Sequence, residues 1–239
     1  MHDYLRRMVE QKRTFDLSGH EREVTGGITS WEVDFFQSLI EQNRLRVCLE
    51  TGVAYGVSTI AICEALSRLD GDRKLFGVDP CQHTDYDGAA IAALKACGMD
   101  HLFELIEGPS HTMLPRLLER GVKLDLVFID GWHTFDYTLI DVFYADKMLK
   151  PGGFLLMHDM QMPSKRKVAS FLGTHRRYQR IRGPARPLAR CLLSFGKSLA
   201  LLRPAGAVRI VREIWGPGFL FVARKLVDWE PDYSFFSRF

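Results

Sequence analysis

The sequence has 239 residues, enough for one domain of ordinary size with some additions. Hydrophobic residues make up 46% and charged residues 26% of the chain, a globular composition that excludes a disordered or collagen-like protein. The net charge of +3 is too small to indicate a nucleic-acid partner by itself. Five cysteines without a CxxC motif indicate free thiols in a reducing compartment.

The N-terminal segment is charged and has no apolar stretch of the kind found in a signal peptide. The most apolar C-terminal stretch, residues 191–202, is shorter than the ~20 residues that a membrane helix needs. We therefore expect a soluble, cytoplasmic protein without a transmembrane segment.

The first predicted element is a mainly helical segment, residues 1–45. Ser30 is the expected N-cap of a helix over residues 31–42. One stripe of this helix is apolar and consists of Trp31, Phe35, Phe36, Leu39 and Ile40. A glycine-containing loop, residues 24–28, precedes the helix and is a candidate cover for a binding site.

From residue 46 onward, short apolar runs alternate with helical patterns. Strands are predicted over 46–52, 74–79, 103–107, 124–130 and 154–159, and helices over 57–69, 88–97, 111–119 and 134–149. Continuous apolar runs such as LVFI at 126–129 are typical of strands buried on both faces. The alternation predicts an α/β fold with a doubly wound, Rossmann-like parallel sheet.

The C-terminal part gives weaker signals, a possible strand over 178–182 and a clear last strand over 219–225. Residues 182–212 carry seven basic and no acidic residues. Such a segment can attract an acidic substrate or dock on a membrane surface. The alternative is a solvent-exposed insertion or an oligomer contact without a role in binding. We expect one domain, made of an N-terminal cap (1–45), a core (46–182), a basic insertion or lid (183–217), and the last strand with a tail (218–239).

The first chemical motif, ETGVAYGVST, follows the first core strand. Gly52 and Gly56 are expected to let the backbone approach a ligand, and Ser58 and Thr59 offer hydroxyl groups at a helix N-terminus. The motif differs from GxGxxG and from the P-loop. Glu50 makes the turn acidic, which disfavours a pyrophosphate and favours a cationic ligand, although a plain tight turn is the alternative.

Two further polar residues follow the next strands. Asp79 ends the second core strand, where a carboxylate reaches the ribose hydroxyls of a nucleoside or serves as a loop acid. Ser110 follows the third strand and either caps the next helix or faces a nucleoside base.

The most specific motif lies at the ends of the fourth and fifth strands. Asp130 ends the fourth strand and His133 follows it, and a histidine near a carboxylate is suited to act as a general base. His158 and Asp159 end the fifth strand. If the two strands are neighbours, Asp130, His158 and Asp159 supply oxygen and nitrogen ligands for Mg²⁺ or Mn²⁺. Asp141 is interpreted as a solvated helix acid.

Together, ETGVAYGVST, Asp79, FIDGWH and LKPGGFLLMHD resemble class I S-adenosylmethionine-dependent methyltransferases. Within that class they are most similar to the macrocin and mycinamicin sugar O-methyltransferases and, more distantly, to catechol O-methyltransferase. The resemblance implies a seven-stranded sheet whose last strand is antiparallel, with S-adenosylmethionine as cofactor and a divalent metal. EDTA is then expected to abolish activity.

The resemblance also implies roles for individual residues. His133 is the catalytic base, with Asp130 beside it, and Asp130, His158 and Asp159 hold the metal. His158 departs from the pattern, because those relatives have an acid at this position. The implied cofactor-binding residues are Glu50, Gly52, Tyr55, Gly56, Ser58, Asp79, Ser110 and Asp130.

The predicted function is therefore S-adenosylmethionine-dependent O-methylation of a hydroxyl group on a small molecule or sugar, as in secondary metabolism. Two alternative functions stay open: a non-catalytic nucleoside-binding protein of the same fold, and a methyltransferase without a metal. The oligomeric state is open too, a homo-oligomer included. The absence of GxGxxG disfavours an NAD-dependent oxidoreductase.

Overall fold

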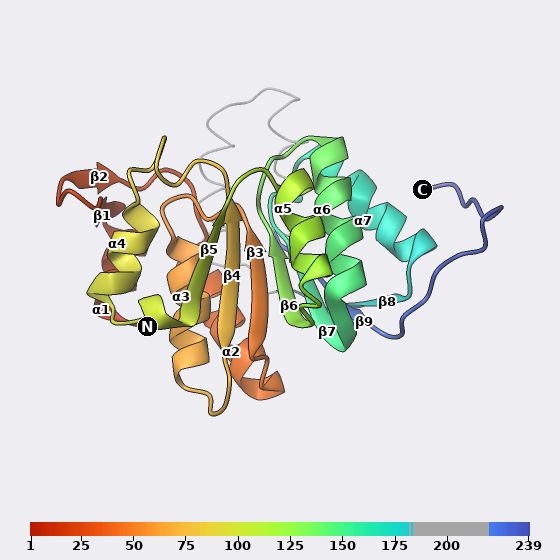
Figure 1. Ribbon diagram of the computed structural model, residues 1–239, viewed down its shortest axis with the longest axis horizontal. Helices are drawn as coiled ribbons and strands as arrows, with labels where there is room; N and C mark the ends of the chain where they lie inside the picture. The colour runs from red at the N-terminus through yellow and green to blue at the C-terminus, as the bar shows by residue number, and fades with distance from the viewer. Residues whose placement is uncertain (182, 184–219) are drawn as a thin grey trace, which may run out of the picture.

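The computed structural model describes residues 1–181, 183 and 220–239. Within these residues, seven strands form one sheet in the order β5-β4-β3-β6-β7-β9-β8 (Figure 1). Only β9 runs antiparallel to its neighbours β7 and β8. The predicted fold class is confirmed. The strands are β3 (Val47–Thr51), β4 (Lys74–Asp79), β5 (Phe103–Glu107), β6 (Leu124–Ile129), β7 (Leu149–Met157), β8 (Tyr178–Ile181) and β9 (Phe221–Lys225).

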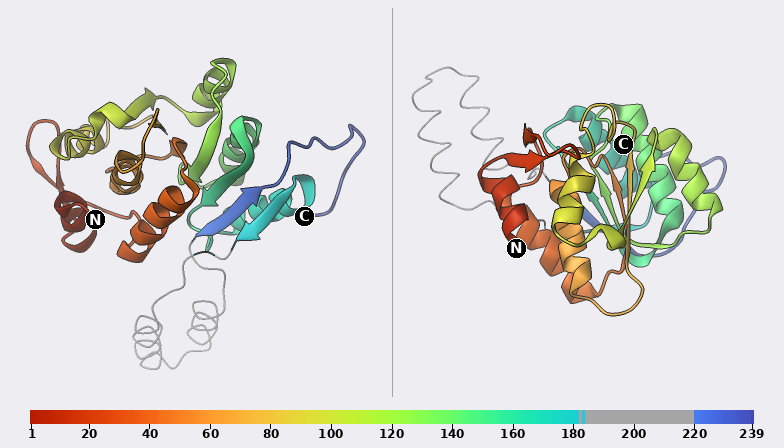
Figure 2. Two further views of the ribbon diagram at one scale, coloured as in Figure 1. Left: turned by 90° about the horizontal axis from the view of Figure 1, so that it is seen from below. Right: turned by 60° about the vertical axis from the view of Figure 1, so that its left-hand side comes forward.

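Helices cover both faces of this sheet, as Figures 1 and 2 show. One face carries α1 (Asp3–Glu10), α2 (Ser30–Asn43), α3 (Val57–Ser67) and α4 (Ala89–Ala96), and the other carries α5 (Ser110–Glu119), α6 (Phe135–Met148) and α7 (Pro163–His175). A short 3₁₀ helix, Asp100–Leu102, precedes β5.

The continuous apolar run in β6 is explained by burial on both faces. Leu126 and Phe128 pack into the core beneath α2 and α3, whereas Val127 and Ile129 pack into the core beneath α5 and α6. Successive side chains of a strand point to opposite faces, so a strand between two helical layers needs apolar residues throughout.

The N-terminal segment differs from the prediction. A two-stranded hairpin, β1 (Arg13–Phe15) and β2 (Glu21–Glu23), separates α1 from α2, so the segment is not simply helical. The N-cap of α2 is Thr29 rather than Ser30, because Thr29 and Glu32 form a reciprocal capping box. Val33 is also fully buried, whereas Trp31 and Phe35 are only half-buried.

Two more expectations need correction after β6. Strand β7 begins at Leu149, because the KPGG stretch continues the strand through a register shift against β6 instead of lying outside it. Helix α7 has no counterpart in the prediction. The expected insertion, residues 183–217, lies outside the described residues except for Gly183, as does the start of the predicted last strand. No helix in the described ranges is long and apolar enough to span a membrane.

The strand register brings the carboxyl ends of β3, β4, β6 and β7 to the same level of the sheet, so the chemical motifs that follow these strands lie along one edge. Thr51 is paired with Val78 of β4 and with Ile129 of β6, and Ile129 is paired with Met157 of β7. The chain moves outward from β3 to β5 on one side and then from β6 to β7 on the other. The residues that follow these strands therefore meet at the point where the strand order reverses, which is where open α/β sheets bind ligands.

Candidate active site

A cavity of about 870 Å³ opens at this edge of the sheet. Its size is in the range of ligand sites in proteins, roughly 300–1,000 Å³. All the predicted site residues except Glu50 and Ser110 line it. The lining members are Gly52, Tyr55, Gly56, Ser58, Asp79, Asp130, His133, His158 and Asp159.

The two glycines of the first motif have backbone angles that favour glycine, with φ of +85° at Gly52 and +86° at Gly56. A Cβ atom at Gly52 would overlap the carbonyl oxygen of Asp130, and one at Gly56 would lie 2.7 Å from the Cβ of Ala90. Close approach to other parts of the protein, the loop after β6 at Gly52 and helix α4 at Gly56, thus already requires glycine at both positions. The reason given from the sequence was incomplete, although both glycines line the cavity.

Glu50 lies behind the turn instead of in the cavity wall. Its carboxyl group is fully buried and accepts hydrogen bonds from the hydroxyls of Ser58 and Thr59, the latter at 2.6 Å. Burial raises the pKa of Glu50 to about 8, against the effect of the two hydroxyls. Glu50 therefore joins the end of β3 to the first turn of α3.

Asp79 shapes the opposite side of the same turn. Its Oδ2 accepts hydrogen bonds from the backbone N–H groups of Val53 at 2.9 Å and Ala54 at 2.8 Å. Its Oδ1 accepts one from the N–H of Cys81 at 2.7 Å. The carboxylate thereby fixes the loops after β3 and β4, which together form one wall of the cavity.

Ser110 and Asp141 occupy places that the sequence did not predict. Ser110 is the first residue of α5 and Pro109 is the N-cap, so Ser110 is not the cap. Asp141 is only 1% exposed and accepts a hydrogen bond from Thr51 Oγ1 at 2.9 Å, so it is not a solvated helix acid. Burial raises the pKa of Asp141, whereas Ser110 and Thr51 act in the opposite direction.

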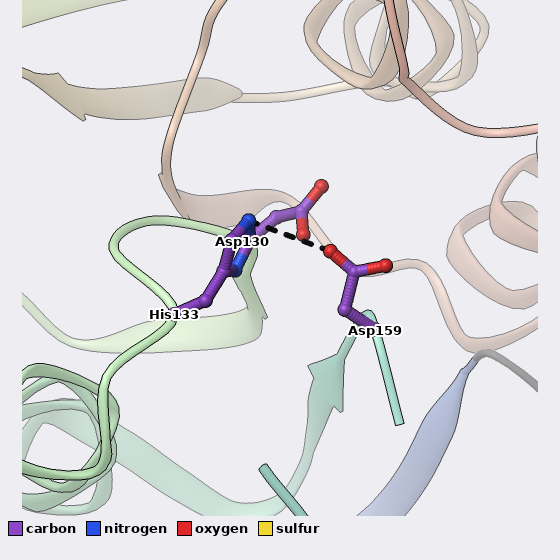
Figure 3. Close-up of side chains that lie close together, drawn as sticks. All are labelled: Asp130, His133 and Asp159. Carbon is purple, nitrogen blue, oxygen red and sulfur yellow. Dashed lines mark ion pairs between the residues drawn. The ribbon is translucent and has the colours of Figure 1, made fainter. Parts of the chain in front are cut away.

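Asp130, His133 and Asp159 converge from the loops after β6 and β7 (Figure 3). His133 Nε2 lies 3.5 Å from Asp159 Oδ2, and the side chain of His133 is 41% exposed. One ligand atom from each residue lies within 4.8 Å of the others, a spacing that can accommodate a metal ion. The expected convergence of the two aspartates is confirmed, but the histidine in this group is His133 and not His158.

His158 lies between carboxylates. Its Nδ1 is 3.4 Å from Asp130 Oδ1 and 3.6 Å from Asp159 Oδ1, and its Nε2 is 3.3 Å from Glu32 Oε1. Burial lowers the pKa of His158, but Asp130 and Glu32 outweigh burial and raise it to about 10. An imidazolium has no lone pair for a metal, so this geometry does not support His158 as a metal ligand.

The distances allow a metal, and the residues that would hold it are Asp130, His133 and Asp159. His158 Nδ1 also lies within 3.6 Å of both aspartates, so the same carboxylates contact this ring.

Sequence reasoning missed Glu32 and Lys165. Glu32 is buried, and its role at the site follows from the capping box, which places the carboxyl group at the start of α2 facing β7. The TSWE pattern was a readable signal for that cap. Lys165 is a fully buried amine near the same acids, and no sequence pattern singles it out.

The loop before α2, which was predicted as a cover, lines the cavity through Val24 to Gly27. Asp85 and Tyr86 also contribute, from the loop before α4. The predicted lid, residues 183–217, lies outside the described residues except for Gly183. Trp132 also lines the cavity and is 66% exposed.

Comparisons with known proteins agree with this architecture. Residues 49–160 match a family model described as a methyltransferase domain. The O-methyltransferase TomG of Streptomyces achromogenes, crystallised with S-adenosylmethionine, is 21% identical, with 65% of this chain and 73% of that chain covered and a TM-score of 0.56. A putative O-methyltransferase from Klebsiella pneumoniae is 19% identical over 76% and 82% of the chains, with a TM-score of 0.60.

A Podospora anserina methyltransferase bound to S-adenosylhomocysteine is 17% identical over 78% of this chain and 85% of that chain, with a TM-score of 0.61. Likeness at these identities shows the fold, and the family match adds the activity class. The chain is an S-adenosylmethionine-dependent methyltransferase, an enzyme of class EC 2.1.1.

Proposed function

We propose that this enzyme transfers the methyl group of S-adenosylmethionine to a hydroxyl group of a small molecule or sugar, with His133 as the general base. The observation that carries the proposal is the half-exposed imidazole of His133, which faces the cavity beside Asp159. Several proteins of the same fold are named as O-methyltransferases, which supports oxygen as the acceptor atom.

The cavity is suited to a cationic cofactor. Carboxylate groups of Glu32, Asp79, Asp130 and Asp159 line it, and they favour the sulfonium and ammonium charges of S-adenosylmethionine. Asp79 keeps free lone pairs after its three backbone hydrogen bonds, so it can still accept bonds from ribose hydroxyls. Glu50 and Ser110, which lie behind the cavity wall, would act on the cofactor through the turns that they support.

The proposed chemistry is a direct methyl transfer. His133 takes the proton of the acceptor hydroxyl, the oxygen forms a bond to the methyl carbon, and the carbon–sulfur bond breaks with its electron pair passing to sulfur. Asp159, 3.5 Å from Nε2, favours a proton on that nitrogen, which leaves Nδ1 to accept the new one and stabilises the imidazolium that forms. Holding oxygen, carbon and sulfur in line supplies much of the acceleration.

The cavity rim supports two classes of acceptor. Trp132 precedes His133 and presents a largely exposed ring to the cavity. A flat exposed ring offers a stacking surface for a sugar or an aromatic acceptor. We therefore propose acceptors of these two classes, in keeping with the resemblance to sugar and catechol O-methyltransferases.

The test is transfer of an isotope-labelled methyl group to a panel of sugars and phenols by wild type and by His133→Asn. Loss of the base is expected to lower kcat by about 10²–10⁴-fold and to leave the Kd for S-adenosylhomocysteine within about twofold. His101→Asn, which changes an exposed histidine away from the cavity, is the matched control. Unchanged kcat in His133→Asn would exclude the proposed base, and no transfer to any acceptor would favour a non-catalytic nucleoside-binding protein.

A further inference from the structure

The N-terminal hairpin docks on a loop that lines the cavity. The hairpin consists of β1, β2 and the turn between them, and it packs beside α4 (Figure 1). The loop, residues 80–88, connects β4 to α4 and brings Asp85 and Tyr86 to the cavity wall. The ring of Tyr86 meets the ring of Tyr55, which also lines the cavity, edge to face with centroids 5.0 Å apart. The hairpin therefore contacts a loop that faces the proposed cofactor site.

The contact is made by the last two residues of the loop, Asp87 and Gly88. The carbonyl oxygen of Asp87 accepts a hydrogen bond from the backbone N–H of Leu17 at 3.1 Å, and its Oδ2 accepts one from Arg22 Nη1 at 2.5 Å. A Cβ atom at Gly88 would overlap Cδ1 of Leu17, so the leucine side chain lies directly against this glycine. A backbone bond, an ion pair and an apolar contact thus hold the loop next to Tyr86.

The backbone of the loop depends on such contacts. Asp87 has φ of +48° and Gly88 has φ of +68°, so two successive residues lie in the left-handed region. Aspartate tolerates this region better than most residues, but the conformation still persists only where its surroundings hold it. The start of the loop is held separately, because Gln82 Nε2 donates a hydrogen bond to the carbonyl of Ala54 at 2.7 Å. The place of Tyr86 therefore depends on what holds the other end.

Arg22 joins the turn of the hairpin to this loop. Its Nη1 lies 3.8 Å from Asp16 Oδ2 as well as 2.5 Å from Asp87 Oδ2. The side chain of Asp16 is only 3% exposed, and its Oδ1 accepts hydrogen bonds from the N–H groups of Ser18 and His20, both at 2.9 Å. The guanidinium therefore links the carboxylate that shapes the hairpin turn to a carboxylate of the cavity-lining loop.

The same hairpin leads into a second part of the cavity wall. Strand β2 ends at Glu23, and the residues that follow it, Val24 to Gly27, line the cavity. The N–H of Val24 donates a hydrogen bond to the carbonyl of Lys12 at 2.8 Å, and Lys12 Nζ donates one to the carbonyl of Gly26 at 3.3 Å. One hairpin thus supports two separate segments of the cavity wall.

We propose that Arg22 and Leu17 are positioning residues, which hold the loop after β4 so that Tyr86 is in place when S-adenosylmethionine binds. A loop that is ordered before binding does not have to be ordered by the cofactor, so the apparent affinity rises with the fraction of molecules in the competent form. The inference rests on the proposed function, because it takes this cavity as the cofactor site.

The first arm of the test measures the Kd for S-adenosylhomocysteine by titration calorimetry. Arg22→Ala is expected to raise the Kd by about threefold to tenfold, and Leu17→Ala combined with Arg22→Ala by at least about tenfold. Arg22→Lys keeps the charge and should recover most of the affinity. Arg13→Ala is the matched control and should stay within about twofold of wild type, since Arg13 forms its ion pair with Glu21 inside the hairpin.

A double-mutant cycle locates the effect at the loop. Asp87→Asn removes the charge but keeps a residue that tolerates a positive φ. If Arg22 acts through Asp87, then Arg22→Ala should change the Kd by less than about twofold once Asp87→Asn is present.

The second arm follows the loop itself. The N–H groups of Asp85, Tyr86 and Gly88 donate backbone hydrogen bonds within the loop, so their hydrogen exchange reports its opening. Exchange over residues 82–88 should be at least about tenfold faster in Arg22→Ala than in wild type or Arg13→Ala. In methyl transfer by Arg22→Ala, the KM for S-adenosylmethionine should rise with the Kd while kcat stays within about twofold, because His133 comes from the loop after β6.

Two results would overturn the inference: a Kd in the folded Leu17→Ala/Arg22→Ala variant within about twofold of wild type, or an equal rise in Arg13→Ala and Arg22→Ala. Circular dichroism checks folding. If the double variant does not fold, the cycle decides, because an effect of Arg22→Ala that Asp87→Asn leaves undiminished contradicts the contact. If wild type binds no S-adenosylhomocysteine, the proposed cofactor site fails, and unchanged exchange over residues 82–88 in Arg22→Ala would still refute the hold of the hairpin on the loop.

Discussion

Asp79 shows how one carboxylate fixes both the turn and the ligand site. Three backbone N–H groups point at its two oxygens, so a neutral amide cannot replace it without turning a donor toward donors. The resemblance implied a role in ribose binding, and the structure adds that Asp79 builds the wall against which a ribose would lie.

Asp79→Asn is therefore expected to lower the free energy of unfolding by about 1–3 kcal/mol, because a buried charge-assisted set of hydrogen bonds is broken. The affinity for S-adenosylhomocysteine should fall with it, by at least about tenfold. Chemical denaturation and calorimetry measure the two effects. Asp72→Asn, at an exposed position in the loop before β4, is the control and should change the stability by less than about 0.5 kcal/mol. An equal loss of unfolding free energy in Asp79→Asn and Asp72→Asn would contradict the proposed role of Asp79 in the turn.

At the residue scale, the sequence predicted most of the residues that line the site, but not always the physical reason why each residue is needed there. Asp130, His133 and Asp159 converge as expected, since they follow neighbouring parallel strands. The glycines at 52 and 56 were expected to admit a ligand, whereas protein atoms already fill the space that a side chain would need. Which atoms lie opposite a glycine depends on packing between distant segments, and no local pattern reports it.

Among the elements, the junction between α2 and β7 has the clearest consequence. Glu32 at the start of α2 and Asp130 after β6 hold His158 at the end of β7. The capping box at Thr29 and Glu32 could be read from the sequence. The approach of α2 to β7 could not, because it depends on tertiary packing between segments far apart in the chain.

This junction predicts a pH dependence of stability. The pKa of His158 is raised to about 10, above the value near 6.5 that is ordinary for an unfolded chain. The group therefore stabilises the fold fully below about pH 6.5, and the contribution is lost as the pH rises toward 10. The loss is at most about 1.4 kcal/mol per pH unit.

Denaturation curves of wild type and His158→Gln between pH 6 and 10 measure this contribution. Glutamine keeps hydrogen-bonding capacity but cannot carry the charge, so the difference in unfolding free energy between the two proteins should shrink as the pH rises. A difference that stays constant over the whole range would show that His158 is not an imidazolium in the folded protein.

For the whole molecule, the alternation of buried strands and helices was enough to predict a doubly wound sheet, whereas the antiparallel last strand was predicted only through the resemblance to class I methyltransferases. The hairpin of β1 and β2 was not predicted, because three-residue strands with exposed positions give no clear periodicity. The charge arrangement under the site was not predicted either, since Lys165 and Asp141 become neighbours of the site only through the packing of α6 and α7.

The central claim is that the cavity at the carboxyl ends of β3, β4, β6 and β7 binds S-adenosylmethionine for methyl transfer. The most direct measurement is isothermal titration of S-adenosylmethionine into wild type and into Asp79→Asn and Asp130→Asn. The account predicts one site per chain in wild type and affinity at least about tenfold weaker in both variants. The absence of binding heat in wild type, or equal affinity in all three proteins, would contradict it.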